Sequence, residues 1–232
     1  YQTFLDNAGD YISDYLSRAF QDAQEADRAS LEELGMVFTD LTEEQRAEYL
    51  SVIEEESLRL SALANNVLSL TRVENQTILT DVSEFNLSEQ IRGAVLLLAD
   101  KWTAKDLNID LGFDECLVRA NYELLKQVWI NLLDNAVKFS PQNGTVTVEM
   151  TETDRSVTVT VTNSGRDIPP ESLAHIFNKF YQADESHSSE GNGIGLAIVK
   201  RVCELHGGSV DACSDGGLTT FTVTLPRNSY AQ

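Results

Sequence analysis

The stretch Asn131-Leu-Leu-Asp-Asn135-Ala-Val-Lys138 lies in a segment whose apolar residues recur with the spacing of a helix. Asn131, Asn135 and Lys138 are four and three residues apart, which predicts that they share one helix face. The apolar residues between them fall on the opposite face, where they would pack on a sheet. A side-chain carbonyl is a suitable ligand for Mg²⁺, and a lysine can contact a phosphate. A solvated polar face is the alternative that this stretch alone leaves open.

A second polar segment, Asn163-Ser-Gly165, follows an alternating run that is typical of a strand. A polar side chain at the end of a strand can point into a cleft, where Asn163 could recognise the edge of an adenine. Gly165 permits a close approach of the backbone. Since strands commonly end in Asn and Gly, an ordinary turn is the alternative.

The third segment, Gly191-Asn-Gly193-Ile-Gly195-Leu196, leads directly into an amphipathic helix. Glycines at a helix N-terminus leave backbone N–H groups that can bind an anion, such as a phosphate. A glycine-rich hinge is the alternative, and both interpretations are compatible. The chain contains no G-x-x-x-x-G-K-[ST] sequence, so a P-loop is excluded. Together the three segments predict a nucleotide site of another kind.

The composition restricts the classes of function. The chain has 232 residues, 42% of them hydrophobic, and a formal net charge of −20. This charge disfavours binding to nucleic acid and to anionic membrane surfaces. The three cysteines include no C-x-x-C pair, so we expect buried, unpaired thiols in a reducing cytoplasm. The longest apolar run, Ala94 to Ala99, is too short to span a bilayer, and we expect a cytoplasmic protein or the cytoplasmic part of a membrane-bound sensor.

Residues 1–78 are predicted to form a helical hairpin. Thr42-Glu-Glu-Gln45 is a capping box that would start the second helix. A hairpin with single apolar stripes cannot bury itself well, and pairing of two hairpins in a dimeric four-helix bundle would solve this. The stripe of the second helix consists of Leu50, Ile53, Leu60, Leu63, Val67 and Leu70.

Residues 84–228 have the mixed periodicity of an α+β domain, with helices on one face of a mixed sheet. The expected strands are 82–87, 107–113, 117–120, 145–150, 156–162, 209–213 and 218–225. The expected helices are 88–104, with Ser88 as its cap, 122–139, 170–177 and 193–205.

Residues 84–228 resemble the catalytic ATP-binding domain of two-component sensor histidine kinases, which has the Bergerat-type α/β sandwich shared with gyrase and heat-shock chaperone ATPases. Five motifs occur in the family order, namely an N box (127–140), a G1 box (161–165 with 168–169), an F box (176–181), a G2 box (191–200) and a His-Gly-Gly turn (206–208). Residues 1–78 resemble the dimerisation and phosphotransfer hairpin of the same kinases.

The resemblance implies roles for the residues above. Asn135 would be the Mg²⁺ ligand, Asn131 and Lys138 would lie near the phosphates, and Asn163 would face adenine. The glycines of the G2 box would line the phosphates beneath a lid formed by residues 166–190. ATP, Mg²⁺ and a response regulator receiver domain are the implied cofactors and partner, and a homodimer would form through the hairpin.

Position 131 bears on the reaction. The hydrolytic relatives carry a glutamate there as a general base, and an amide cannot activate water in that way. Phosphoryl transfer or simple binding is therefore favoured over ATP hydrolysis. The family usually has Asp where Asn163 stands, so we expect weaker adenine binding. It often has Arg where Asn178 and Gln182 stand, so we expect weaker γ-phosphate binding.

The phosphoacceptor is the main departure, because no histidine precedes His175. Asp10 stands at the phosphoacceptor position in one register, whereas an ungapped count from the hairpin turn gives a site nearer Phe20. His206 is expected to be structural, and His175 to pack against its neighbours. Three readings remain open: a kinase acting on a partner's histidine, a pseudokinase scaffold that binds a response regulator or partner kinase, and an anti-sigma-type serine kinase.

Overall fold

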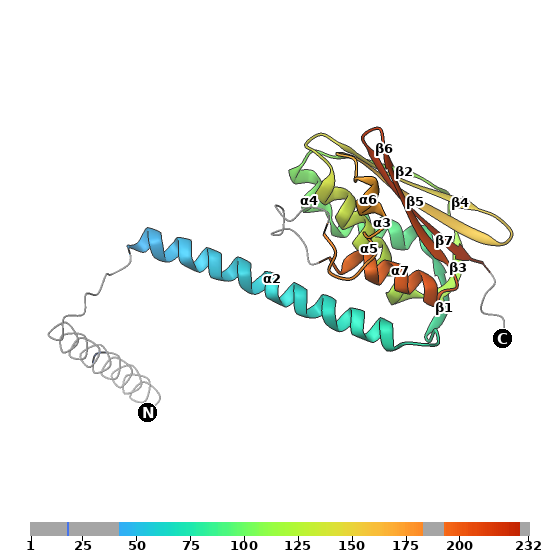
Figure 1. Cartoon of the computed structure of the whole chain (residues 1–232), viewed down its shortest axis with the longest axis horizontal. Coiled ribbons are helices and arrows are strands. Elements are labelled where there is room, and N and C mark those ends of the chain that lie inside the picture. The colour runs from blue at the N-terminus through green and yellow to red at the C-terminus, as the bar shows by residue number, and fades with distance from the viewer. Residues whose placement is uncertain (1–17, 19–41, 183–192, 228–232) are drawn as a thin grey trace, which may run out of the picture. The chain divides into compact units, whose positions relative to one another are not determined.

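The computed structural model describes residue 18, residues 42–182 and residues 193–227. The chain divides into two units, residues 1–57 and residues 58–232, and each is considered by itself. The first helix of the predicted hairpin, with Asp10 and Phe20, lies outside the described residues apart from residue 18. The second helix is α2, Glu43–Asn75 (Figure 1).

Helix α2 begins at the predicted capping box. The Thr42 N–H donates to Gln45 Oε1 at 3.0 Å, and the Gln45 N–H donates back to Thr42 Oγ1 at 3.2 Å. The apolar stripe of α2 has two different environments. Leu50, in the first unit, is 65% exposed, whereas Leu70, in the second unit, is 6% exposed and belongs to the hydrophobic core. The last turns of α2 therefore pack within the second unit.

The second unit is built on a five-stranded sheet with the order β2-β4-β5-β7-β6. Strand β2 is parallel to β4, and the other pairs are antiparallel. Its strands are β2 Asn108–Gly112, β4 Thr145–Glu152, β5 Ser156–Ser164, β6 Ser209–Asp215 and β7 Leu218–Pro226. A separate antiparallel pair joins β1 Val82–Asn86 to β3 Leu117–Asn121.

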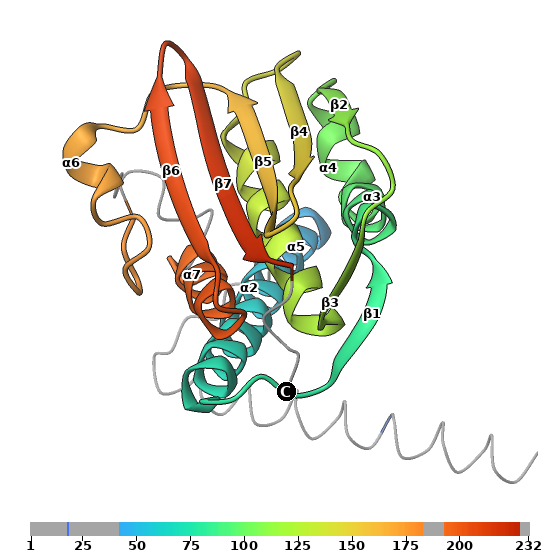
Figure 2. The same ribbon diagram turned by 90° about the vertical axis from the view of Figure 1, so that its right-hand side faces the viewer.

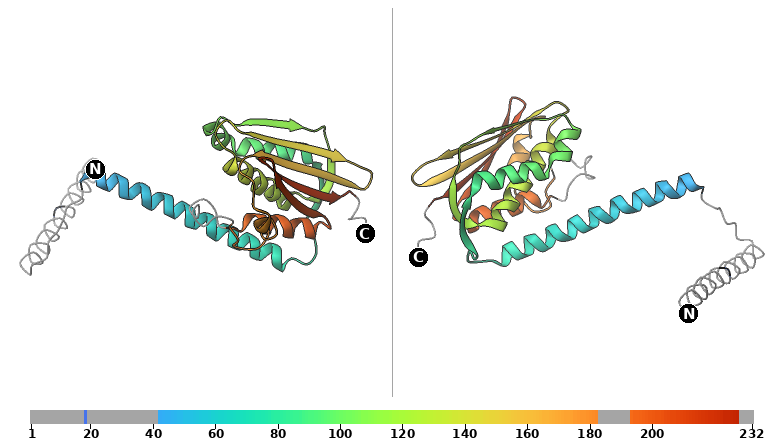
Figure 3. Two further views of the ribbon diagram at one scale, coloured as in Figure 1. Left: turned by 45° about the horizontal axis from the view of Figure 1, so that its top comes forward. Right: turned by 180° about the vertical axis from the view of Figure 1, so that it is seen from behind.

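Helices cover one face of this sheet, as Figures 2 and 3 show, and the α+β class is confirmed. They are α3 Leu87–Leu97, α4 Ala99–Ala104, α5 Tyr122–Phe139, α6 Pro170–Leu173 and α7 Gly195–Leu205. The inward-facing residues of the central strand β5, Val157, Val159 and Val161, are each 1% exposed. The sheet thus keeps one face in the core and one face partly open to solvent.

Helix α5 has the two faces that its sequence predicts. Leu132 and Ala136 are fully buried, and Leu133 and Val137 are 3% and 4% exposed. Asn131, Asn135 and Lys138 are only partly buried. The apolar side of α5 packs in the core of the second unit, which leaves its polar stripe directed away from the sheet.

The predicted cap of α3 is wrong. The helix begins at Leu87, and the side chain of Asn86 caps it by accepting from the Glu89 N–H at 3.1 Å. Ser88 instead faces inward, where its hydroxyl donates to the Asp114 carbonyl at 2.7 Å and accepts from the Cys116 N–H at 3.0 Å. The predicted helix 88–104 is also interrupted at Leu98, which separates α3 from α4.

Two other predictions need correction. Helix α7 begins at Gly195 and not at Gly193, because Gly193 has a φ of +62°, which no right-handed helix contains. Cys213 is exposed on β6, while Cys116 and Cys203 are buried as expected. His175 is exposed, although its ring lies 5.7 Å from that of Tyr181.

His206 joins α7 to the start of α5. Its side chain is 1% exposed, its Nδ1 lies 2.8 Å from the Val202 carbonyl, and its Nε2 accepts from the Asn121 N–H at 3.2 Å. Asn121 in turn caps α5 by accepting from the Leu124 N–H at 2.9 Å. The structural role expected for His206 agrees with this geometry.

We predict that His206 makes stability depend on pH. Burial lowers its pKa below the usual value of 6.5, because desolvation disfavours the imidazolium ion. The unfolded chain then binds more protons, so the free energy of unfolding should fall as the pH drops below about 6.5. In urea unfolding between about pH 7 and pH 5, this loss should be smaller in His206→Gln.

The control is His175→Gln, which removes an exposed imidazole and should leave the pH dependence as in the unmodified chain. Equal slopes for His206→Gln and the unmodified chain would contradict the prediction.

Candidate nucleotide site

The N box and the G2 box are in direct contact. The side-chain amide of Asn131, on α5, donates to the Gly195 carbonyl at 3.3 Å. A Cβ placed on Gly195 would meet Asn131 Cγ at 3.6 Å, an ordinary van der Waals distance. The polar stripe of α5 therefore adjoins the first residue of α7.

The N-terminus of α7 is suited to an anion. Among the described residues, no side chain caps it. Ile194, which precedes the helix, is fully buried and fixes its start, while Gly195 and Leu196 are partly accessible. The first backbone N–H groups of a helix lack partners within the helix and favour negative charge. A phosphate could occupy this position next to Asn131.

The F box and the G2 box meet at the base of the segment 183–192. The Phe180 N–H donates to the Gly193 carbonyl at 2.8 Å. A Cβ on Gly193 would lie 2.7 Å from the Phe180 carbonyl carbon and 2.7 Å from the Tyr181 oxygen. The close packing of backbone on backbone requires glycine here. Gly191, predicted to bind nucleotide, lies outside the described residues.

The G1 box adjoins the end of α5. Asn163 is 3% exposed and lies on the helix-covered side of β5, and its amide donates to the Ser164 carbonyl at 3.2 Å. A Cβ on Gly165 would lie 2.7 Å from the Phe139 carbonyl oxygen. Gly165 thus allows a close backbone approach, and the neighbouring atom belongs to α5.

The remaining predicted residues lie on the last turns of α5. Asn135 and Lys138 are partly buried, and the Lys138 ammonium group lies 4.5 Å from the centroid of the Phe139 ring. Sequence reasoning missed Lys105, whose ammonium group donates to the carbonyls of Val137, Lys138 and Ser140 at 3.1, 2.6 and 3.1 Å. No motif marks Lys105, because its partners are main-chain atoms.

The side chains fit a magnesium ion that is held mainly by a nucleotide. Within the part of the chain that the structure describes, no group of three or more His, Cys, Asp or Glu residues could hold a metal. Mg²⁺ usually keeps several waters and binds few protein groups together with substrate phosphates. The Asn135 carbonyl could supply one such oxygen ligand.

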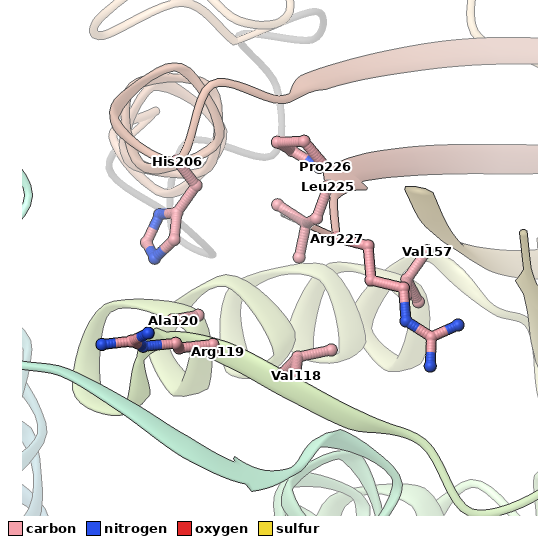
Figure 4. A pocket seen from close by; sticks show the side chains of 8 residues that line it. All are labelled: Val118, Arg119, Ala120, Val157, His206, Leu225, Pro226 and Arg227. Carbon is pink, nitrogen blue, oxygen red and sulfur yellow. The ribbon is translucent and has the colours of Figure 1, made fainter. Parts of the chain in front are cut away.

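A small pocket lies elsewhere, between β3 and β7 (Figure 4). Its volume is about 10 Å³, which is room for about one water, and His206 and Arg227 are among its lining residues. None of the predicted nucleotide-binding residues lines it.

Across residues 42–182 and 193–227, no helix has the length and apolarity needed to cross a membrane.

Known proteins resemble this chain in sequence and in fold. Residues 120–229 match the family described as histidine kinase-, DNA gyrase B- and HSP90-like ATPases. The chain is 35% identical over 176 residues to the sensor histidine kinase CusS of Escherichia coli K12, a match that covers 74% of this chain and 36% of CusS. The chain is a homologue of the sensor histidine kinases.

Two solved histidine kinases share the fold. Full-length ShkA in complex with AMPPNP is 28% identical, with a TM-score of 0.69 over 81% of this chain and 40% of ShkA. The catalytic domain of ThkA is also 28% identical, with a TM-score of 0.59 over 64% of this chain and 97% of that domain. The Bergerat fold is therefore confirmed, and the chain spans about a third of the length of CusS.

We predict that Gly193→Ala is more destabilising than a matched glycine substitution. Gly193 and Gly216 both have a φ of +62°, but a Cβ on Gly216 has nothing within 4 Å. Gly216→Ala should cost about 1–2 kcal/mol of unfolding free energy through backbone strain alone. Gly193→Ala adds overlap with the F-box backbone and should cost more in chemical unfolding. Equal losses in the two variants would show that the contact with Phe180 is unimportant.

Proposed function

We propose that this sensor histidine kinase homologue binds Mg-ATP at the junction of α5, β5 and α7. The observation that carries the proposal is the hydrogen bond from Asn131 to the Gly195 carbonyl. It joins the polar stripe of α5 to a helix N-terminus that no side chain of the described residues caps. The AMPPNP complex of the related ShkA supports the same ligand class. Asn131 and Lys138 would contact the phosphates, and Asn163 would face the adenine.

Asn135 would hold Mg²⁺ through its side-chain carbonyl. The ion would supply charge neutralisation at the phosphates, and the chain's own groups would fix the position of the nucleotide. Because Asn131 is an amide and not a carboxylate, no general base stands at the position that activates water in the hydrolytic relatives. This favours transfer or binding over hydrolysis.

The partner is proposed to be a response regulator receiver domain, with a homodimer formed through residues 1–78. ThkA, in its complex with the response regulator TrrA, shares the fold of this chain at 22% identity, with a TM-score of 0.68 over 95% of this chain. The apolar stripe of α2 supports the homodimer, since Ile53 and Leu60 are 60% and 65% exposed. Such exposed apolar side chains suit a helical bundle.

The alternative is a pseudokinase scaffold, and a specific observation favours it. Residues 1–78 contain no histidine, and His206 is buried with hydrogen bonds at both ring nitrogens. Kinase chemistry of this family needs a nucleophilic nitrogen in line with the γ-phosphate. The phosphoryl group would then go to a histidine on a partner, or ATP would serve only as a structural ligand.

We expect Asn135→Ala to weaken Mg-ATP binding at least about tenfold, through loss of a metal ligand. Calorimetric titration measures this, and the unfolding free energy should change little, since Asn135 is only partly buried. The matched control is Asn108→Ala, an exposed asparagine on β2. Equal binding by Asn135→Ala and the unmodified chain would refute the assignment of Asn135.

A second measurement separates a self-phosphorylating kinase from a pseudokinase scaffold. The protein is incubated with γ-labelled ATP and Mg²⁺, with and without a receiver domain. The pseudokinase alternative predicts no acid-labile label on this chain. Label that appears on the chain and disappears in Asn135→Ala would establish self-phosphorylation and exclude the scaffold alternative.

A further inference from the structure

Lys105 closes the C-terminal end of α5. Its ammonium group donates three hydrogen bonds, to the carbonyls of Val137, Lys138 and Ser140. The shortest of them, 2.6 Å, goes to the backbone of Lys138. Lys105 lies after α4 and is far from α5 in sequence, so these bonds join the loop before β2 to the last turn of the N-box helix.

One other carbonyl at this end of α5 also has hydrogen-bond donors, and another is in close contact with a glycine. The Ala136 carbonyl accepts from the Ser140 N–H at 3.1 Å and from the Ser140 hydroxyl at 2.7 Å. The Phe139 carbonyl lies against Gly165 of the G1 box. The last carbonyls of a helix lack partners within the helix, and a cation beside them is favoured by the helix dipole. Lys105 supplies that cation.

Lys105 is itself held in place at its backbone. Its carbonyl accepts from the Asn143 N–H at 2.9 Å, and Asn143 belongs to the turn that follows α5. The residue therefore contacts both sides of the α5–β4 connection. Its partly buried ammonium group is fixed by three acceptors, unlike that of a surface lysine with one partner.

A neighbouring lysine shows the difference. Lys101, on α4, also reaches α5, where its ammonium group lies 2.5 Å from Asp134 Oδ1. The two side chains are 61% and 40% exposed, and exposed pairs of this kind contribute little. Lys101 does not touch the backbone of the last turn of α5 in the contacts that the structure describes.

We infer that Lys105 is a positioning residue for nucleotide binding, because it fixes the backbone from which Lys138 extends toward the phosphates. The inference rests on the proposed function, which places Lys138 at the phosphates. Without Lys105 the carbonyls of Val137, Lys138 and Ser140 would lose this donor. The backbone that carries the Lys138 side chain would then be held less firmly.

A double-mutant cycle tests this inference on the whole chain, with Lys105→Met, Lys138→Met and the double variant. Lys105→Met should weaken Mg-ATP binding about tenfold in the unmodified background and less than about twofold in Lys138→Met. Affinity for adenosine, which lacks phosphates, should be unchanged. Lys101→Met is the matched control and should leave ATP affinity unchanged. If Lys105→Met does not fold, Lys105→Gln, which can still donate to a carbonyl, should give a smaller loss that is likewise reduced in the Lys138→Met background.

Each result decides between roles. An equal loss of ATP affinity in both backgrounds, or a parallel loss of adenosine affinity, would overturn the inference and leave Lys105 a purely structural role. Unchanged ATP affinity in Lys105→Met would also overturn it. Normal ATP binding by Lys138→Met would refute the phosphate role that the proposed function gives to Lys138. This result would be distinct from a failure of the contact made by Lys105.

Discussion

The burial of one side of α5 is the constraint on which the second unit depends. Leu132 and Ala136 are fully buried against the sheet, so the helix cannot rotate without exposing core residues. With that rotation fixed, Asn131 is directed to the start of α7 and the last turn to Lys105. The proposed nucleotide site is in this sense a consequence of packing, since the same helix supplies the core face and the polar face.

The glycines of the site serve different physical purposes. A Cβ placed on Gly165 or on Gly193 would lie 2.7 Å from a backbone atom of another segment, so a side chain has no room whether or not a ligand is bound. Gly195 has only ordinary contacts at the Cβ position. The lack of a side chain at Gly195 is better explained by access to the N-terminal N–H groups of α7. Motif glycines that look equivalent in sequence therefore divide into packing positions and one position that is proposed to face the ligand.

Much of this arrangement could be predicted from the sequence, because strong periodicity reports burial directly. The bounds of α5 agree with the prediction, and the alternating runs of β4 and β5 form the expected antiparallel pair. The cap at Ser88 failed because Asn86, two residues earlier, also caps well and Ser88 has inward-facing partners. Lys105 could not be predicted, since its acceptors are carbonyls whose position depends on the tertiary fold.

The imidazoles of the second unit show why ATP binding and phosphoryl transfer must be considered separately. His206 contacts the Val202 carbonyl of its own helix through Nδ1 and the Asn121 N–H at the start of α5 through Nε2, and its lowered pKa reflects burial, not reactivity. His175 is exposed, with Nδ1 3.2 Å from the Asn178 amide. The groups proposed to bind ATP belong to the second unit, so the absence of a histidine from residues 1–78 does not remove them.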